Sequence, residues 1–140
     1  MEKKQKKWYT LLMFEVRVEA GFCAAHYLKN YHGKCESLHG HNYKVYAHAR
    51  GKSLDGGGML LDFTELKKAL RAVCGSLDHT NLNDIEEFDQ NPSAERIAVY
   101  IYRAILQQIP SLALDAKSDV HLYAVDVFET DTNRARYIAE

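Results

Sequence analysis

Apolar and polar side chains alternate along two segments near the start of the chain, which is the pattern of a half-buried β-strand. The first segment runs from Met13 to Glu19, and the second runs from Asn42 to Arg50. Two later segments, Val120–Glu129 and Asn133–Ile138, are separated by a turn signal, and the first of them is rich in β-branched and aromatic residues. The chain is therefore expected to contribute four strands.

Two segments between these strands carry apolar residues three or four positions apart, which predicts amphipathic helices. The first helix is Asp62–Leu77, with Asp62 and Glu65 forming a capping box. The second runs from about Pro92 to Ile109, with Asn91 as its cap and Pro110 at its end. The order ββααββ predicts an α+β fold, in which two helices cover one face of a four-stranded antiparallel sheet.

An open sheet of four strands leaves two edges and one face without a covering layer, and proteins normally pair or blunt such edges. Both faces of the predicted strands carry apolar or aromatic residues, including Tyr43, Tyr46 and Tyr123. We therefore expect other subunits of a homo-oligomer to cover the edges and the second face. The alternative is a monomer with ordinary surface tyrosines.

The length and composition indicate a single globular domain over residues 1–140, with residues 1–10 as a flexible basic tail. The 18 basic and 19 acidic residues give a net charge of −1, which argues against a nucleic-acid partner. The chain has no apolar run long enough to cross a membrane and no signal peptide, so we expect a cytoplasmic protein without a membrane partner.

Three of the seven histidines are brought together by strand geometry. His39 and His41 are two positions apart, so in a strand they point to the same face, with the parity of the inward residues of the second strand. His26 has the inward parity of the first strand. Pairing the two strands as a hairpin therefore places His26, His39 and His41 at one end of the sheet, where three imidazoles suit a catalytic Zn²⁺ with one open position. Iron, nickel and copper also accept imidazole.

Four further residues are candidates for chemistry. Cys35 lies in the predicted hairpin loop, where a nearby metal ion would lower the pKa of its thiol, and it could be a ligand, a nucleophile or a proton carrier. Asp78 directly precedes His79, and an aspartate can orient a histidine or stabilise its protonated form. Glu129 ends the third strand, where a buried carboxylate could accept two N–H groups of a heterocycle.

The ordered set of these motifs resembles the 6-pyruvoyl-tetrahydropterin synthase and 6-carboxy-tetrahydropterin synthase superfamily. Each motif alone is weakly specific, but together they recur in order from about Phe14 to Thr130. They are Phe22–His26, Cys35–Tyr43, Leu61–Phe63, Leu77–His79, Leu82–Asn83, Asn91–Pro92 with Glu95, and Glu129–Thr130.

The resemblance implies the tunnelling fold, in which three subunits close a twelve-stranded barrel and two trimers stack into a hexamer. It also implies roles for individual residues. His26, His39 and His41 would hold zinc, and Cys35 would abstract a proton. Asp78 and His79 would complete the proton relay, coming from a neighbouring subunit. Glu129, followed by Thr130, would bind the pterin substrate.

The spacing between the cysteine and the first histidine of the pair separates two subgroups of this superfamily. Cys35 and His39 are separated by three residues, as in the bacterial carboxy-forming enzymes, whereas the pyruvoyl-forming animal enzymes have five. The sequence thus favours a zinc lyase of queuosine (7-deazaguanine) biosynthesis that converts 7,8-dihydroneopterin triphosphate to 6-carboxytetrahydropterin, acetaldehyde and triphosphate. The alternatives are a 6-pyruvoyl-tetrahydropterin synthase and a zinc-stabilised binding module without turnover.

Overall fold

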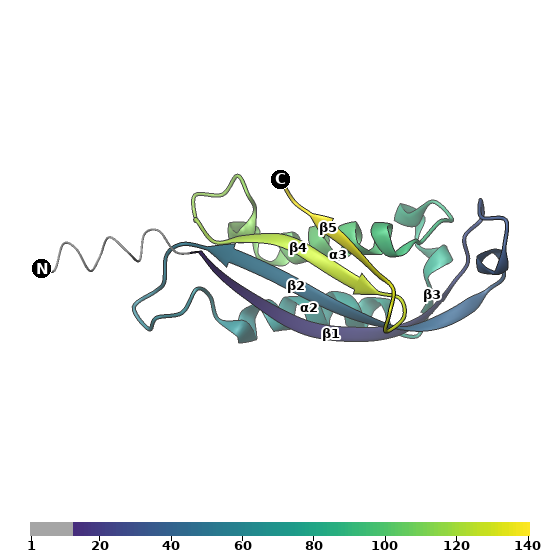
Figure 1. Cartoon of the computed structure of the whole chain (residues 1–140), viewed down its shortest axis with the longest axis horizontal. Coiled ribbons are helices and arrows are strands. Elements are labelled where there is room, and N and C mark those ends of the chain that lie inside the picture. Colours follow the sequence, from purple (N-terminus) through teal and green to yellow (C-terminus); the bar gives the residue numbers. More distant parts are fainter. Residues whose placement is uncertain (1–12) are drawn as a thin grey trace, which may run out of the picture.

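A computed structural model describes residues 13–140 of the chain, and the predicted tail at residues 1–10 lies outside this range. Two long strands, β1 (Phe14–His26) and β2 (His39–Gly51), form an antiparallel hairpin that runs the length of the molecule (Figure 1). β4 (His121–Phe128) pairs with β2, and β5 (Arg134–Ile138) pairs with β4. All four predicted strands are present, and β1 is longer than the alternation alone indicated.

A fifth strand departs from the prediction of a four-stranded, wholly antiparallel sheet. β3 is only Thr80–Asn81, and it pairs in parallel with β1 at Ala24 and Ala25, so the strand order is β3-β1-β2-β4-β5. Two residues are too few to show a period of two, and this is why the sequence pattern did not predict the strand. β3 fixes the segment after the first helix to the end of β1.

Two helices pack on one face of the sheet and lie behind it in Figure 1, as predicted. α2 (Phe63–Leu77) begins after Asp62, whose side chain accepts a hydrogen bond from the Thr64 amide at 2.8 Å. α3 (Ala94–Gln108) begins two residues later than predicted. Its cap is Ser93, whose hydroxyl accepts a hydrogen bond from the Arg96 amide, and the predicted cap at Asn91 is wrong.

The core fills the space between the helices and the inward face of the sheet. The inward rows of β1 and β2 are buried there as their parity predicted, and they meet the apolar stripes of the two helices. The largest fully buried apolar side chains are Phe88, Leu66, Leu70, Leu77, Leu82, Ile97, Ile101, Ile105, Leu122, Val45 and Val125. Among residues 13–140, no helix has the length and apolarity needed to cross a membrane.

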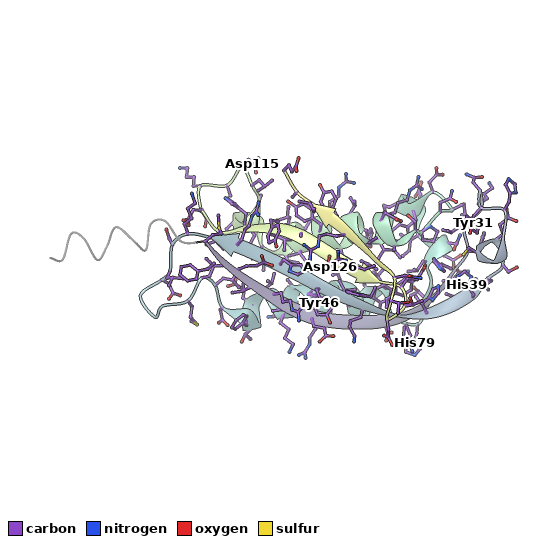
Figure 2. The ribbon with its side chains drawn as sticks, viewed as in Figure 1. Tyr31, His39, Tyr46, His79, Asp115 and Asp126 are labelled. Atoms are coloured by element: carbon purple, nitrogen blue, oxygen red, sulfur yellow. The ribbon has the colours of Figure 1, made fainter. Side chains whose placement is uncertain are left out.

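The face of the sheet opposite the helices carries a network of charged and polar side chains with a buried centre. His48 of β2 contacts Glu15 of β1 at 3.2 Å and Asp126 of β4 at 2.7 Å. Arg136 of β5 donates two hydrogen bonds to Asp126, at 2.6 and 2.9 Å. His48 and Asp126 are each only 3% exposed, and Figure 2 marks Asp126 on this face beside Tyr46. The network joins four strands of the sheet.

Candidate metal centre

Three histidines meet at the end of the β1–β2 hairpin that lies away from the N-terminus, as the strand parity predicted. His26 and His39 are direct partners across the two strands. The ring centroids lie 4.6 Å apart for His26 and His39, 5.0 Å for His26 and His41, and 4.8 Å for His39 and His41. One nitrogen from each ring lies within 4.8 Å of the other two, which is close enough for all three to bind a single ion.

The hydrogen bonds of two rings leave the outer nitrogens available for a metal. His26 Nδ1 lies 2.9 Å from the Pro92 carbonyl oxygen, and His39 Nδ1 lies 2.7 Å from that of Ser37. Each Nδ1 must therefore carry the proton and donate, which leaves a lone pair on Nε2.

Two buried nitrogens of these rings also indicate a bound ion. His26 Nε2 and His41 Nε2 are buried without a hydrogen-bond partner among the described residues. Buried polar atoms normally have partners, and a bound ion accounts for such orphans. The three residues thus fit a metal ion held by three imidazoles.

Glu129 lies against the three histidines, and the sequence did not predict this position for it. Its Oε1 is 3.2 Å from His26 Nε2 and 3.5 Å from His41 Nε2, which are charge contacts without the geometry of a hydrogen bond. The contact with His26 lowers the pKa of the Glu129 carboxyl below its usual value; burial opposes this effect, and His41 and His39 reinforce it. A carboxylate at this position remains ionised at neutral pH beside any ligand that the histidines bind.

The pKa of His41 is also lowered. Burial is the main cause, with smaller contributions of the same sign from His26 and His39, while Glu129 raises it. A lowered pKa keeps the ring neutral near pH 7, and the neutral ring is the form that binds a metal. The electrostatics of the cluster therefore agree with its geometry.

Cys35 lies in the loop between β1 and β2, within the short 3₁₀ segment Lys34–Glu36. Its carbonyl accepts a hydrogen bond from the Leu28 amide at 2.7 Å, which closes the loop above the end of the hairpin. The thiol is partly buried, and it is not a member of the group whose atoms could share one ion. Its role as a proton carrier stays a prediction.

Asp78 and His79 form a pair at the edge of β1. Asp78 Oδ2 lies 2.8 Å from His79 Nδ1, and Asp78 Oδ1 accepts a hydrogen bond from the Cys23 amide at 2.8 Å. The Cys23 amide and then His79 lower the pKa of Asp78. His79 has a φ of 56°, an uncommon value for a residue with a side chain, and its amide donates to the Cys23 carbonyl. These backbone contacts fix the orientation of the pair.

The His79 ring is not one of the three rings whose nitrogens could share one ion. Its side chain is 82% exposed and lines a shallow hollow with Cys23, Ala25 and Asn42, and His41 also lines this hollow. Figure 2 shows His79 at the edge of the molecule, apart from His39. The structure therefore orients the Asp78–His79 pair beside a hollow that His41 also lines, and it does not place the His79 ring among the nitrogens that could share the ion.

Thr130 follows Glu129 at the start of the turn between β4 and β5. Its hydroxyl accepts a hydrogen bond from the Asn133 amide at 3.1 Å. This bond gives Thr130 a structural role in the turn that holds Glu129 in place. Its predicted contact with substrate stays a prediction.

The backbone contact that supports His26 could not be predicted from the sequence. The motifs Leu82–Asn83 and Asn91–Pro92 were part of the resemblance, but their spacing gave no sign that the Pro92 carbonyl reaches His26 from 66 positions away in the chain. A backbone carbonyl has no signature in the residue type, so only the fold could reveal this contact.

Comparison with known proteins identifies the family. The model of the 6-pyruvoyl tetrahydropterin synthase family matches residues 15–140. The chain belongs to this family. Its members are pterin synthases, and the chain is thus a member of an enzyme family that acts on pterins.

Relatives with two different names are similar to this chain. A 6-carboxy-5,6,7,8-tetrahydropterin synthase from Synechocystis is 35% identical over 133 residues, covering 91% of this chain and 95% of the relative. A 6-pyruvoyl tetrahydrobiopterin synthase from Drosophila melanogaster is 40% identical over 110 residues, covering 75% of this chain and 61% of the relative. Both kinds of synthase are therefore represented at comparable identity.

The fold is also shared with solved structures. The 6-pyruvoyl tetrahydropterin synthase of Caenorhabditis elegans superposes with a TM-score of 0.75 at 29% identity, covering 92% of this chain and 97% of that one. This similarity confirms the predicted tunnelling fold.

Proposed function

We propose that the protein is a zinc-dependent 6-carboxy-5,6,7,8-tetrahydropterin synthase. It converts 7,8-dihydroneopterin triphosphate and one water to 6-carboxytetrahydropterin, acetaldehyde and triphosphate, as a lyase of queuosine (7-deazaguanine) biosynthesis in the cytoplasm. The observation that carries this proposal is the group His26, His39 and His41, in which two buried Nε2 atoms have no hydrogen-bond partner among residues 13–140. The three-residue spacing between Cys35 and His39 supports the carboxy-forming reaction.

His26, His39 and His41 would hold the zinc, which would supply Lewis-acid polarisation of the substrate side chain and so make its carbon-bound protons more acidic. Cys35, in the loop above the centre, takes a proton as a general base, and His79 carries protons on the other side of the substrate. Asp78 orients His79 and stabilises its protonated form through the 2.8 Å contact between them. Glu129 accepts hydrogen bonds from the 2-amino group and ring N–H of the pterin beside the histidines.

We propose that Asp78 and His79 serve the centre of a neighbouring subunit in a dimer of trimers. Two features support this arrangement. The His79 side chain is 82% exposed and lies outside the group of rings that could share one ion, and the long edge of β1 before Ala24 has no strand partner among the described residues. Exposed sheet edges of this length are normally paired or covered.

A 6-pyruvoyl-tetrahydropterin synthase is the second candidate, because relatives of that name match the chain as well as the carboxy-forming ones do. The two reactions differ in one product. Only the carboxy-forming enzyme cleaves a carbon–carbon bond and releases acetaldehyde, whereas the pyruvoyl-forming enzyme stops after triphosphate elimination.

Acetaldehyde and triphosphate release from 7,8-dihydroneopterin triphosphate test the proposal. The zinc-loaded protein should release both products in equal amounts, and a chelator should abolish the release until zinc is restored. The variant Cys35→Ala should keep its zinc and lose roughly 10²–10⁴-fold in turnover, as expected for loss of a general base.

Each contrary result has a distinct meaning. Triphosphate without acetaldehyde would identify the pyruvoyl-forming reaction. A protein that unfolds on chelation and turns over neither product would be a zinc-stabilised binding module. Loss of zinc from Cys35→Ala would make Cys35 a ligand and remove the proposed base.

A further inference from the structure

Three residues close a ring of hydrogen bonds directly after the metal ligand His26. The Tyr27 amide donates to Asn83 Oδ1 at 2.9 Å, and Asn83 Nδ2 donates back to the Tyr27 carbonyl at 3.0 Å. Asn83 Nδ2 also donates to the Gln90 carbonyl, and Gln90 Nε2 donates to the Asn83 carbonyl, each at 3.2 Å. The Tyr27 hydroxyl completes the ring with a bond to Gln90 Oε1 at 3.0 Å.

Asn83 occupies the buried centre of this ring. It is only 3% exposed, and its side-chain amide makes three of the five bonds of the ring, two with the Tyr27 backbone and one with the Gln90 carbonyl. A buried amide is costly when its bonds are unmade, so a fully bonded one specifies a single arrangement of the segments around it. The ring therefore fixes the end of β1 relative to the segment at residues 82–93.

The same segment delivers the carbonyl that orients His26. Asp89 and Gln90 have φ values of 48° and 61°, the left-handed conformation that residues with side chains rarely adopt. This local reversal leads into Asn91 and Pro92, and the Pro92 carbonyl meets His26 Nδ1 at 2.9 Å. Backbone strain of this kind persists only where the surroundings hold it, and the bonds to Gln90 do so here.

We propose that Asn83 and Gln90 are positioning residues for the metal, acting on His26 from two sides. Through Tyr27 they fix the backbone that carries His26, and through the left-handed turn they hold the Pro92 carbonyl on its Nδ1. That carbonyl keeps the proton on Nδ1 and the lone pair of Nε2 directed at the ion. The inference rests on the proposed metal function and assigns residues that set the affinity of the centre.

Three substitutions separate the parts of the ring. Asn83→Asp preserves the shape and the Oδ1 acceptor but removes both Nδ2 donors. Gln90→Ala removes the bonds of an exposed side chain, so it tests the proposal even if Asn83→Asp does not fold. Tyr27→Phe removes only the hydroxyl bond. Gln107→Ala is the matched control at an exposed amide of α3. Ile105→Val is a second control that lowers stability from the core, and both controls lie near the C-terminal end of α3, away from Pro92.

Zinc ion alone is the probe, with its dissociation constant measured by competition against a chromophoric chelator. Loss of a residue that orients a ligand weakens metal binding by roughly 10–100-fold, and we expect this range for Asn83→Asp and about 10-fold for Gln90→Ala. Tyr27→Phe should weaken binding by less than Gln90→Ala does. Cobalt-substituted Asn83→Asp and Gln90→Ala should show a shifted visible absorption spectrum at saturating cobalt, because the His26 ring is reoriented.

The controls distinguish positioning from general loss of stability. Ile105→Val should lower the melting temperature and leave both the zinc affinity and the cobalt spectrum unchanged. Gln107→Ala should leave the melting temperature, the zinc affinity and the cobalt spectrum all unchanged. The inference is overturned if Gln90→Ala and Asn83→Asp bind zinc within twofold of the unsubstituted protein with an unshifted cobalt spectrum. If the unsubstituted protein binds neither ion, the proposed metal function fails and this inference fails with it.

Discussion

Substitution of Asp126 by asparagine is expected to destabilise the sheet strongly, although the residue is far from the candidate metal centre. The carboxylate receives two hydrogen bonds from Arg136, at 2.6 and 2.9 Å, and contacts His48 Nε2 at 2.7 Å. Asparagine keeps the shape of the side chain and removes the negative charge. His48 then remains buried with only the partly exposed Glu15 as a charged partner.

The size of the effect follows from burial. Removing one partner of a buried ion pair costs roughly 3–5 kcal/mol, because the other charge is left without compensation. Arg136 keeps some access to water, since its side chain is 29% exposed, so we expect the lower end of this range, about 3 kcal/mol. At roughly 3–4 °C per kcal/mol for a domain of this size, the melting temperature should fall by about 10 °C.

The loss should depend on pH with a defined sign. Burial raises the pKa of Asp126, but the hydrogen bonds from Arg136 and His48 lower it by more, so the net shift is downward. A group with a lowered folded pKa contributes its stability above its unfolded value of about 3.9 and loses it as the pH falls through the folded pKa. The difference between the two proteins should therefore be full at pH 7 and shrink below about pH 4.

Thermal unfolding at matched protein concentration, monitored by circular dichroism from pH 7 to pH 3, measures this effect. Glu19→Gln is the control, because it makes the same chemical change in an exposed contact with Lys44 and should cost no more than about 1 kcal/mol. Equal effects of Asp126→Asn and Glu19→Gln would refute the reasoning, as would a difference that grows toward pH 3.

Three further predictions follow. His39→Ala should weaken zinc binding by more than the roughly 10–100-fold expected of a supporting residue; unchanged zinc in equilibrium dialysis would contradict this. Gly21→Ala places a Cβ 2.8 Å from the Tyr43 carbonyl oxygen, so it should lower the free energy of unfolding by roughly 1–3 kcal/mol in denaturant titrations. Gly56→Ala is the control, because its Cβ meets no atom within 4 Å, and equal stabilities of the two variants would contradict this. Glu129→Gln should retain zinc while its KM for the pterin rises about 10-fold or more, because a charged hydrogen bond is lost; an unchanged KM would exclude the proposed anchor.

The histidine cluster could be predicted because strand parity is local and rigid. Side chains two positions apart point to the same face, so the relation between His39 and His41 needs no knowledge of the fold. To place His26 beside them, only the register of the β1–β2 hairpin is needed in addition. The inward apolar row of β1 predicted that His26 shares their face, and the structure pairs His26 with His39.

The start of α3 shows where local patterns were insufficient. Asn91 and Ser93 are both good capping residues, and Pro92 suits the first turn of a helix, so the sequence allowed either start. The structure begins the helix after Ser93 and turns the Pro92 carbonyl toward His26 instead. The start at Ser93 thus goes together with a contact between Pro92 and a residue 66 positions away, which local patterns do not encode.

The placement of Asp78 and His79 shows a similar limit. The dipeptide indicated a possible pair, and the structure confirms that the two side chains are in contact. The direction in which His79 faces depends on backbone bonds to Cys23 and on the two-residue strand β3. None of these leaves a periodic signal in the sequence.

The most direct test of the central claim is an anomalous-difference map at the zinc absorption edge, from crystals with the pterin bound. The account predicts one peak at bonding distance from His26, His39 and His41, with a vacant position that faces the pterin and a Cys35 sulfur outside bonding distance. A map without a peak at these rings, or one in which the sulfur is a permanent fourth ligand, would contradict it.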